Sequence, residues 1–559
     1  MRIRRHADTR HRPGSALLAV LVIVALLSLA SYQYSELMFQ EYRAADSSMR
    51  ALQAKAVADS GIHYIAAVLA DPTSFQSMLN GNPYDNQSAL SQVQVYLDSK
   101  TGRTGRFSVV CPVDNNTDGT GSGPTAFRYG VIDECGKINL NALIKVDSTG
   151  QVAHDVLMKL PNMTEDIADA IVDWIDADDE PRASGAESSY YQGLSPPYRC
   201  KNAPLDTLEE LLMVRGVTAQ LLFGNDRNHN GMQDQGEDDG SGWNAGWSAY
   251  LTVYSRERNV DVDGNARAYL NDSNLQTQHD SLVTAVGQDL ADFITLWRTQ
   301  TDGTAPTATV TMSTTGTASG AVTTFRFTQS QSRAATVQEI SDKVNSVLKG
   351  GSSSSSGASG ATGGAGTGGG GGQQQVHSLS SRYQLIGATV SWTIGTGRNQ
   401  QTVTLASPLN DKTKLADLLP KLLDKTSTQQ TMELPGRVNV LTAPQSVLAS
   451  LPGLTDTDVT TIMQARPDPT GGATPDAIYS TPAWLVTDAN ISTAKMQALE
   501  RYITSRTQIY RVQVLGQFDQ GGPFARVEAV IDVNAGKPRI VMYRELTEFG
   551  RGYDLSQQQ

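Results

Sequence analysis

The sequence predicts an α+β fold in which a long N-terminal helix lies on a small antiparallel sheet and a large, mainly α-helical region is inserted between the strands. An apolar stretch from Ser15 to Ser35 continues without glycine or proline into a polar segment. Short alternating segments follow this helix, and others close the chain. Between them a short motif occurs twice, each time before a helical hairpin. Together these observations indicate a sheet interrupted by a duplicated helical insert.

The N-terminal helix is expected over residues 15–71. At ~1.5 Å per residue, its apolar half spans about 30 Å, the hydrocarbon core of a bilayer. Apolar residues at helical 3–4 spacing then form one stripe: Ala51, Ala54, Ala58, Ile62, Ile65 and Leu69. The leader 1–14 is basic and ends in Gly14, so it should remain cytoplasmic. A plain single-pass anchor is the alternative, with Gly14 incidental.

The sheet is expected from two separate parts of the chain. RFSVVCPV and FRYGVID read as its first strands. QIYRVQVLGQ, ARVEAVIDV and PRIVMYRELTE alternate and are separated by turns, as in an antiparallel meander. The intervening residues must therefore form inserted domains.

The insert contains an internal duplication. GKINLNAL (136–143) recurs as GRVNVLTA (436–443), and each copy precedes a helical hairpin. A shorter hairpin, LEELLMVRGVTAQLLFG, occurs at 208–224. Segments rich in Thr, Ser and Val surround the low-complexity tract 350–375, which predicts a β-rich insertion with a flexible linker. The expected organisation is a leader 1–14, a helix 15–71, first strands 72–135, a helical insert 136–301, the β-rich insertion 302–432, a second helical repeat 433–505, final strands 506–548 and a tail 549–559.

The strongest candidate site is DRNHNGMQDQGE at 226–237. It satisfies the loop pattern D-x-[DN]-x-[DN]-G-x5-E at every position. The expected ligands are side-chain or backbone oxygens of Asp226, Asn228, Asn230, Met232, Asp234 and Glu237. Hard oxygen ligands without His or Cys predict calcium. No regular exiting helix is expected after the loop, so it is an EF-hand-like loop outside a full EF-hand. An acidic turn that binds nothing is the alternative.

A second acidic cluster lies in DWIDADDEPRASGAESSYY. Its carboxylates crowd the end of a predicted helix, where negative charge opposes the helix dipole. They belong to Asp173, Asp176, Asp178, Asp179, Glu180 and Glu187. The residues leave two interpretations open: a second metal site made of Asp173, Asp176, Asp178, Asp179 and Glu187, or a salt-bridge network with Arg182 and Arg199.

The net charge and the spacing of a few residue types argue against several classes of function. The net charge of −12 argues against nucleic acid and anionic membrane surfaces as partners. The three cysteines show no CxxC or Cys/His cluster, and the seven histidines form no nucleophile–base set, which argues against an enzyme. Cys111 and Cys135, on neighbouring predicted strands, are the expected disulfide if one forms. The hairpins lack the paired glycines of a phosphate-binding helix-hairpin-helix turn, since Thr455 takes the place of the second.

Four segments resemble a known family: GVIDECGKINLNAL, AIVDWIDADDEPRASGAESSYYQ, PPYRCKNAPLDTLEELLMVRGVT and GRVNVLTAPQSVLASLPGL are similar to the minor pseudopilin K of type II secretion systems. The resemblance runs from Gly14 to Glu548 except for the insertion at 302–432. It implies a pilin-like fold with SAM-like helical hairpins, and cleavage between Gly14 and Ser15 by the prepilin peptidase. It also implies calcium at both acidic sites. Major pilins carry a glutamate at the fifth mature residue, which would be Ala19 here.

The resemblance implies a non-enzymatic role at the tip of a periplasmic filament. Its expected partners are the minor pseudopilins I and J and the major pseudopilin. The chain would be anchored once in the inner membrane, with its bulk in the periplasm, and would cap the pseudopilus and help to start its assembly for protein export. A type IV minor pilin with a calcium-dependent adhesive head is the alternative. The third interpretation is a helical-hairpin protein that binds nucleic acid, and this interpretation would require a cytoplasmic location.

Overall fold

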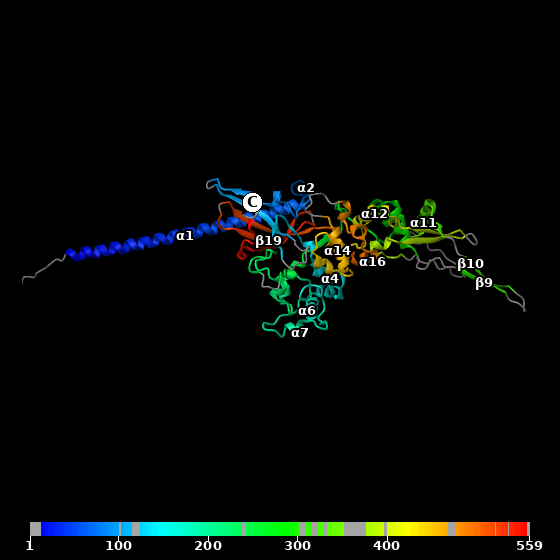
Figure 1. Cartoon of the computed structure of the whole chain (residues 1–559), viewed down its shortest axis with the longest axis horizontal. Coiled ribbons are helices and arrows are strands. Elements are labelled where there is room, and N and C mark those ends of the chain that lie inside the picture. The colour runs from blue at the N-terminus through cyan, green and yellow to red at the C-terminus, as the bar shows by residue number, and fades with distance from the viewer. Residues whose placement is uncertain are drawn as a thin grey trace, which may run out of the picture.

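A computed structural model describes most of the chain. The described residues are 13–99, 102–113, 123–237, 242–300, 309–315, 322–328, 332–350, 376–395, 400–467, 476–519, 521–534 and 536–555. The predicted leader, up to residue 12, and the low-complexity tract from 351 to 375 lie outside these ranges. The described chain is elongated, with the N-terminal helix projecting from one end (Figure 1).

The N-terminal helix α1 (Pro13–Ala70) is one continuous helix of 58 residues. Its first half is exposed throughout, from Leu17 to Phe39. Its second half buries the predicted apolar stripe from Ala54 onward, with Ile62 and Ile65 at most 1% exposed. By length and composition, its Ala16–Ala70 part could cross a membrane. The helix thus divides into an unburied apolar half and a half that belongs to a folded domain.

The sheet on which α1 packs is antiparallel, with strand order β1-β2-β18-β19-β20. Two short strands lie off this path, β3 on β2 and β4 on β18. The strands are β1 (Val93–Leu97), β2 (Thr104–Pro112), β3 (Phe127–Arg128), β4 (Ile132–Asp133), β18 (Ile509–Phe518), β19 (Ala525–Asp532) and β20 (Arg539–Glu545). Segments from the two ends of the chain therefore pair directly, β2 with β18, as a sheet interrupted by an insert requires. The chain has the expected mixed α+β class, with a long N-terminal helix on an antiparallel sheet.

Glycines allow α1 to approach the sheet closely. A Cβ on Gly516 of β18 would lie 2.4 Å from the carbonyl oxygen of Ala54 and 2.7 Å from the backbone nitrogen of Ala58. On the helix side, a Cβ on Gly61 would lie 2.6 Å from a methyl group of Val514. Backbone therefore meets backbone at this crossing, where no larger residue fits.

The opposite face of the sheet is polar and covered. Arg526 is fully buried, and Glu528 and Gln513 are 3% and 5% exposed. Glu528 accepts from Arg544, whose guanidinium also pairs with Glu209 in the insert at 2.9 Å. The sheet thus has α1 on one face and the insert on the other.

The helical insert has one continuous core that includes both copies of the duplicated motif. In the first copy, Ile138 and Asn139 pair in parallel with Leu251 and Thr252; in the second, 438–439 pair in parallel with 503–504. Outside the region 302–432, the helical elements of the insert are α4 (Leu140–Val146), α5 (Gln151–Leu157), α6 (Glu165–Ile175), α7 (Ser188–Tyr191), η2 (Leu208–Met213), α8 (Ala219–Phe223), η3 (Trp247–Ala249), α9 (Leu275–Val286), α10 (Gln288–Arg298), α13 (Gln445–Ser450), α14 (Asp456–Ala465), η7 (Ala477–Ser480), α15 (Trp484–Thr487) and α16 (Thr493–Leu499).

The three predicted hairpins turn in the same way. Asn162, Gly216 and Gly453 occupy equivalent turn positions and all have positive φ, at 58°, 81° and 81°. Each is followed by an extended threonine that precedes the next helix. Glycine and asparagine are the residues that tolerate the left-handed conformation, so the turn chemistry explains which residue types occur here. Thr455 caps α14 through its side chain.

The region 302–432 contains helices as well as the expected strands. The remaining elements before α13 are β5 (Ile138–Asn139), β6 (Leu251–Thr252), β7 (Arg256–Arg258), β8 (Ala268–Tyr269), β9 (Thr309–Thr315), β10 (Val322–Thr328), β11 (Arg333–Ala334), α11 (Val337–Gly350), η4 (Arg382–Leu385), β12 (Thr389–Ile394), β13 (Gln401–Ala406), η6 (Pro408–Asn410), α12 (Lys412–Lys425), β14 (Thr426–Ser427), β15 (Glu433–Pro435) and β16 (Val438–Asn439). Apart from these, α2 (Pro72–Leu79), α3 (Gln87–Leu90), η1 (Glu134–Gly136), β17 (Ile503–Thr504) and η8 (Thr547–Phe549) complete the fold. The β-rich interpretation was therefore incomplete, because α11 and α12 alternate along the chain with the strands that the Thr/Val segments form.

Candidate metal centres

The EF-hand-like loop folds around its own carboxylates. Asp226 accepts from the backbone N–H groups of Asn230 (3.1 Å) and Gly231 (2.8 Å). Glu237 accepts from the N–H groups of Arg227 (2.9 Å) and Asp234 (3.0 Å). The first and last acids of the motif are thus turned inward by the backbone between them.

The tight turn in the loop depends on glycine. Gly231 has φ +73°, and a Cβ there would lie 2.9 Å from a side-chain carbon of Pro112 on β2. Both the left-handed backbone and the contact with the sheet exclude larger residues. This is the position at which the motif requires glycine.

The two asparagines of the loop turn toward Asp234. Asn228 and Asn230 donate their Nδ2 groups to Asp234 Oδ2 at 2.6 and 2.8 Å. A bound cation would need their amide oxygens to turn inward in place of these N–H groups. Met232 is buried, and its N–H donates to Asn230 Oδ1 at 2.8 Å. The structure links the predicted ligand residues by hydrogen bonds within one loop, but among the described residues Asp226, Asp234 and Glu237 do not converge as a group of three within 4.8 Å. The oxygen donor types of the loop fit calcium.

Burial raises the pKa of Asp226 to about 6, and the neighbouring Glu237 carboxylate adds to the rise. Hydrogen bonds from the loop backbone favour the charged form but do not offset its desolvation. A bound cation would offset the remaining cost of burying the charged Asp226 carboxylate.

The loop is fastened to the sheet by residues that the sequence did not single out. Arg526 of β19 donates to the carbonyls of Asn228 and His229. Gln513 of β18 donates to the same His229 carbonyl at 2.8 Å, and Tyr553 donates to the Asn230 carbonyl at 2.7 Å. Tyr553 belongs to the segment expected as a tail, yet it is buried.

The second acidic cluster contains three converging carboxylates. Oxygens of Asp176, Asp178 and Glu187 all lie within 4.8 Å of one another. Asp176 Oδ1 and both oxygens of Glu187 are buried and make no hydrogen bond. Such oxygens are costly unless a cation or a donor reaches them. Their convergence fits a hard cation such as calcium.

The other two predicted ligands of this cluster point elsewhere. Asp173 is buried and accepts from the N–H of Arg182 at 3.2 Å. Asp179 accepts from the N–H of Ser188 at 3.2 Å. These carboxylates hold the loop that returns from the end of α6, which leaves Asp176, Asp178 and Glu187 to face each other.

The alternative of a salt-bridge network is seen at one acid of the cluster, Asp173, which pairs with Arg182. The Arg182 guanidinium lies 3.9 Å from Asp169 and 4.0 Å from Asp173. Among the residues that the structure describes, no ion pair joins Arg182 or Arg199 to the three converging carboxylates. Burial and the neighbouring acids raise the pKa of Glu187 to about 7 and that of Asp176 to about 6.

The predicted disulfide is not formed in this structure. Within the described ranges, no disulfide joins the buried Cys111 and Cys135. Cys111 lies on β2, whereas Cys135 lies in η1 and not on a neighbouring strand as expected. Cys135 packs with Ile509 and Val530 in a separate small cluster. The pairing remains a prediction.

Comparison with known proteins finds similarity to components of type II secretion systems. Residues 136–223 match the family described as "Type II secretion system (T2SS), protein K". Type II secretion system protein K of Pectobacterium carotovorum subsp. carotovorum is 29% identical over 214 residues, which are 37% of this chain and 59% of the relative. The Klebsiella pneumoniae protein of that name is 30% identical over 219 residues, again 37% and 59%. The matched part thus spans less than two thirds of these relatives.

A solved structure with a similar chain is "The Crystal Structure of the GspK-GspI-GspJ complex from enterotoxigenic Escherichia coli Type 2 Secretion System". The aligned region covers 90% of this chain and 99% of the solved one, at 11% identity and a TM-score of 0.35. So low a score supports no structural conclusion. Over 56 residues, the identity to type II secretion system protein K of Aeromonas hydrophila is 48%. The sequence matches thus show that part of this chain, including residues 136–223, is similar to type II secretion system protein K.

Proposed function

We propose that this chain is a minor pseudopilin that caps the tip of the type II secretion pseudopilus and helps to start its assembly for protein export. The observation that carries the proposal is that the two halves of α1 have different surroundings. Its first half exposes an apolar surface over its whole length, and its second half is buried against the sheet. A helix of this kind can lie in a bilayer or among other such helices while the folded part remains outside. The role is structural and non-enzymatic.

The insert favours a terminal position in the filament. It covers the face of the sheet opposite α1 and extends well beyond the sheet (Figure 1). Subunits stacked along a shaft would have to accommodate this bulk at every step. Ala19 also lacks a carboxylate that could pair inside the membrane with the amino terminus of a neighbour. Both features permit neighbouring subunits on the membrane side of this subunit along the filament and none on its far side.

The fold family and processing follow from the same proposal. The long helix on an antiparallel sheet corresponds to a pilin-like core, and the helical hairpins to SAM-like repeats. The prepilin peptidase would cut between Gly14 and Ser15, both at the start of α1. The mature chain would then be held once in the inner membrane with its bulk in the periplasm. The minor pseudopilins I and J and the major pseudopilin would be its partners.

Calcium would stabilise the folded insert. The loop at 226–237 and the Asp176–Asp178–Glu187 cluster would each hold one ion through carboxylate and amide oxygens. A divalent cation there would offset the like charges that raise the acid pKa values. Because Arg526, Gln513 and Tyr553 hold the loop, an ordered loop would also fix the insert on the sheet.

Co-purification tests the function. A tagged chain at native expression level would be extracted from membranes and its partners identified by mass spectrometry. We expect the minor pseudopilins I and J to accompany it. A matched strain would carry Gly14→Ala, a change at the predicted cleavage junction. Recovery with subunits of a type IV pilus instead, and without secretion components, would contradict the proposal.

A further inference from the structure

A cavity in the second half of the insert is lined by arginines. It has a volume of ≈ 410 Å³, and Arg267, Arg382, Arg437 and Arg501 line it. Binding sites for small molecules have volumes of about 300–1,000 Å³. A second hollow of ≈ 20 Å³ shares Arg267, Arg382 and Arg437 with it.

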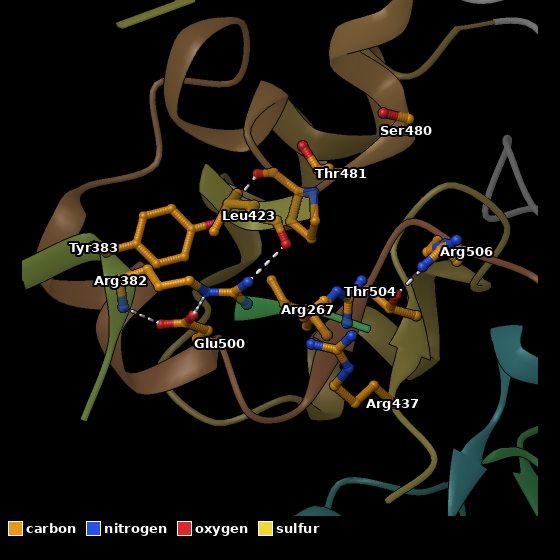
Figure 2. A pocket seen from close by; sticks show the side chains of 12 residues that line it. Arg267, Arg382, Tyr383, Leu423, Arg437, Ser480, Thr481, Glu500, Thr504 and Arg506 are labelled. Carbon is orange, nitrogen blue, oxygen red and sulfur yellow. Dashed lines mark hydrogen bonds and ion pairs between the residues drawn. The ribbon is translucent and has the colours of Figure 1, made fainter. Parts of the chain in front are cut away.

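The lining comes from segments far apart in sequence. Arg267 immediately precedes β8, Arg382 begins η4, and Arg437 lies between β15 and β16. Arg501 follows α16 and is exposed. Figure 2 shows Arg267 and Arg437 beside each other, with Arg382 facing them across the smaller hollow. Four separate parts of the fold thus bring guanidinium groups to one place.

The neighbouring carboxylates are already engaged. Glu500 lines the cavity, but its oxygens accept from Arg382 Nε, from the Arg382 backbone N–H at 2.9 Å and from Ser381. Glu257 accepts from Arg437 Nε at 3.0 Å and from Arg267 Nη1 at 3.4 Å. The cavity therefore has four arginine side chains in its lining, and the two nearby carboxylates are already hydrogen-bonded to three of them.

Guanidinium donors remain after these bonds. Within the described part of the chain, Arg267 Nη2, Arg382 Nη2 and Arg437 Nη1 make no hydrogen bond. None of the three is among the buried atoms that lack a partner, so solvent reaches them. Burial lowers the pKa of Arg267 to about 10, partly offset by Glu257, and the charges of Arg437 and Arg382 lower it further. The cavity is therefore a place of uncompensated positive charge.

We propose that this cavity binds a small, multiply charged oxyanion of the polycarboxylate or phosphate class. The planar guanidinium fork matches the paired oxygens of both groups. Three donors from different segments can be satisfied together only by a ligand with several acceptor oxygens. Such a ligand would join η4, the start of β8 and the connection between β15 and β16 through their arginines and so stabilise the second half of the insert. The inference does not depend on the proposed role in the filament.

The test measures binding to the full chain in detergent, in calcium-free buffer of constant ionic strength. Titration calorimetry would use tricarballylate for the polycarboxylate source and inorganic phosphate for the phosphate source, with acetate as the monovalent comparison. We expect saturable binding of at least one multivalent anion and at least tenfold weaker binding of acetate. Binding of one probe alone identifies the class.

Two variants at the exposed rim locate the site. Arg501→Gln removes one cation, and Gln497→Glu adds a negative charge to the cavity wall. Each should weaken binding about tenfold or more, because a charge-assisted hydrogen bond contributes about this much. Arg539→Gln removes an exposed arginine from β20, a strand that contributes no residue to the cavity lining, and should bind as the unaltered chain does. The inference would be overturned if neither tricarballylate nor phosphate showed saturable binding, or if both rim variants bound the anion as tightly as the unaltered chain.

Discussion

Replacing Glu187 by glutamine should have opposite effects on stability with and without calcium. In the calcium-free chain the Glu187 carboxylate is buried without a hydrogen bond beside Asp176 and Asp178, so the neutral amide should be more stable. With calcium bound, the same carboxylate becomes a ligand, and its loss should weaken the site. A purely structural role for Glu187 would give one sign under both conditions.

The magnitude follows from the pKa. The rise for Glu187 from 4.5 to about 7 corresponds to about 3.5 kcal/mol at ~1.4 kcal/mol per unit. Because Asp178 is exposed and solvent screens part of the interaction, we expect about 1.5 kcal/mol. Calcium at a hundredfold excess over its Kd stabilises the native state by about 2.7 kcal/mol. Glu187→Gln should therefore be about 1.5 kcal/mol more stable in chelator and about 1 kcal/mol less stable in calcium.

The pH dependence has a defined sign. An acid whose folded pKa is raised binds more protons in the folded state, so stability falls as pH rises between about 4.5 and 7. Calcium favours the charged form and should remove or reverse this slope. Glu187→Gln in chelator should lose the part of the slope that Glu187 contributes, mainly at the upper end of this range, because Asp176 and Asp226, with pKa values of about 6, still contribute below it.

The assay is denaturant unfolding of the full chain in detergent, followed by tryptophan fluorescence, in chelator and in calcium. Glu180→Gln is the matched control, because Glu180 is exposed in the same segment and lies outside the three carboxylates. It should follow the unaltered chain under both conditions. Calcium bound at the 226–237 loop would affect all variants equally. If Glu187→Gln has the same sign of effect in both buffers, the cluster is not a calcium site.

Three further predictions follow from the fold. N-terminal sequencing of the membrane-extracted chain should begin at Ser15; an intact leader or a cut inside the apolar helix would contradict the proposed processing. Glu237→Ala should remove the calcium-dependent gain in stability that the loop provides, about 2.7 kcal/mol at a hundredfold excess over Kd, and a melting temperature that ignores both chelator and variant would show that the loop is only a turn. Gly516→Ala should destabilise the chain by about 1–3 kcal/mol, since the new Cβ would meet the backbone of α1, and an unchanged unfolding midpoint would refute the close helix–sheet crossing.

Local patterns predicted the elements that depend on local chemistry. The spacing of the apolar stripe gave the buried half of α1, and the D-x-N-x-N-G pattern located a loop whose acids do turn inward. Strand β1 was missed because it is an edge strand with four of its five residues exposed, so it lacks the alternation that marks a half-buried strand. Helices α11 and α12 were missed because the Thr/Val-rich segments near them dominated the interpretation of this region.

Contacts between distant segments could not be predicted in this way. Arg526 reaches Asn228 across 298 positions of sequence, and no spacing rule relates them. In the acidic cluster, composition identified five carboxylates, but backbone N–H groups bind those of Asp173 and Asp179. Which acids remain for a metal is decided by the path of the returning loop, and that path is a property of the whole insert.

Strand β18 connects the N-terminal helix α1 with the candidate calcium loop. Successive side chains of a strand point to opposite faces, so Gly516 and Gln513, three positions apart, face opposite sides of the sheet. Gly516 lies against the backbone of α1, and Gln513 donates to the loop carbonyl of His229. Displacement of the loop would therefore disturb the strand that supports α1. Because a strand inside a packed sheet cannot deform alone, an ordered loop would hold the insert in a fixed orientation relative to α1, as the proposed position at the end of a filament requires.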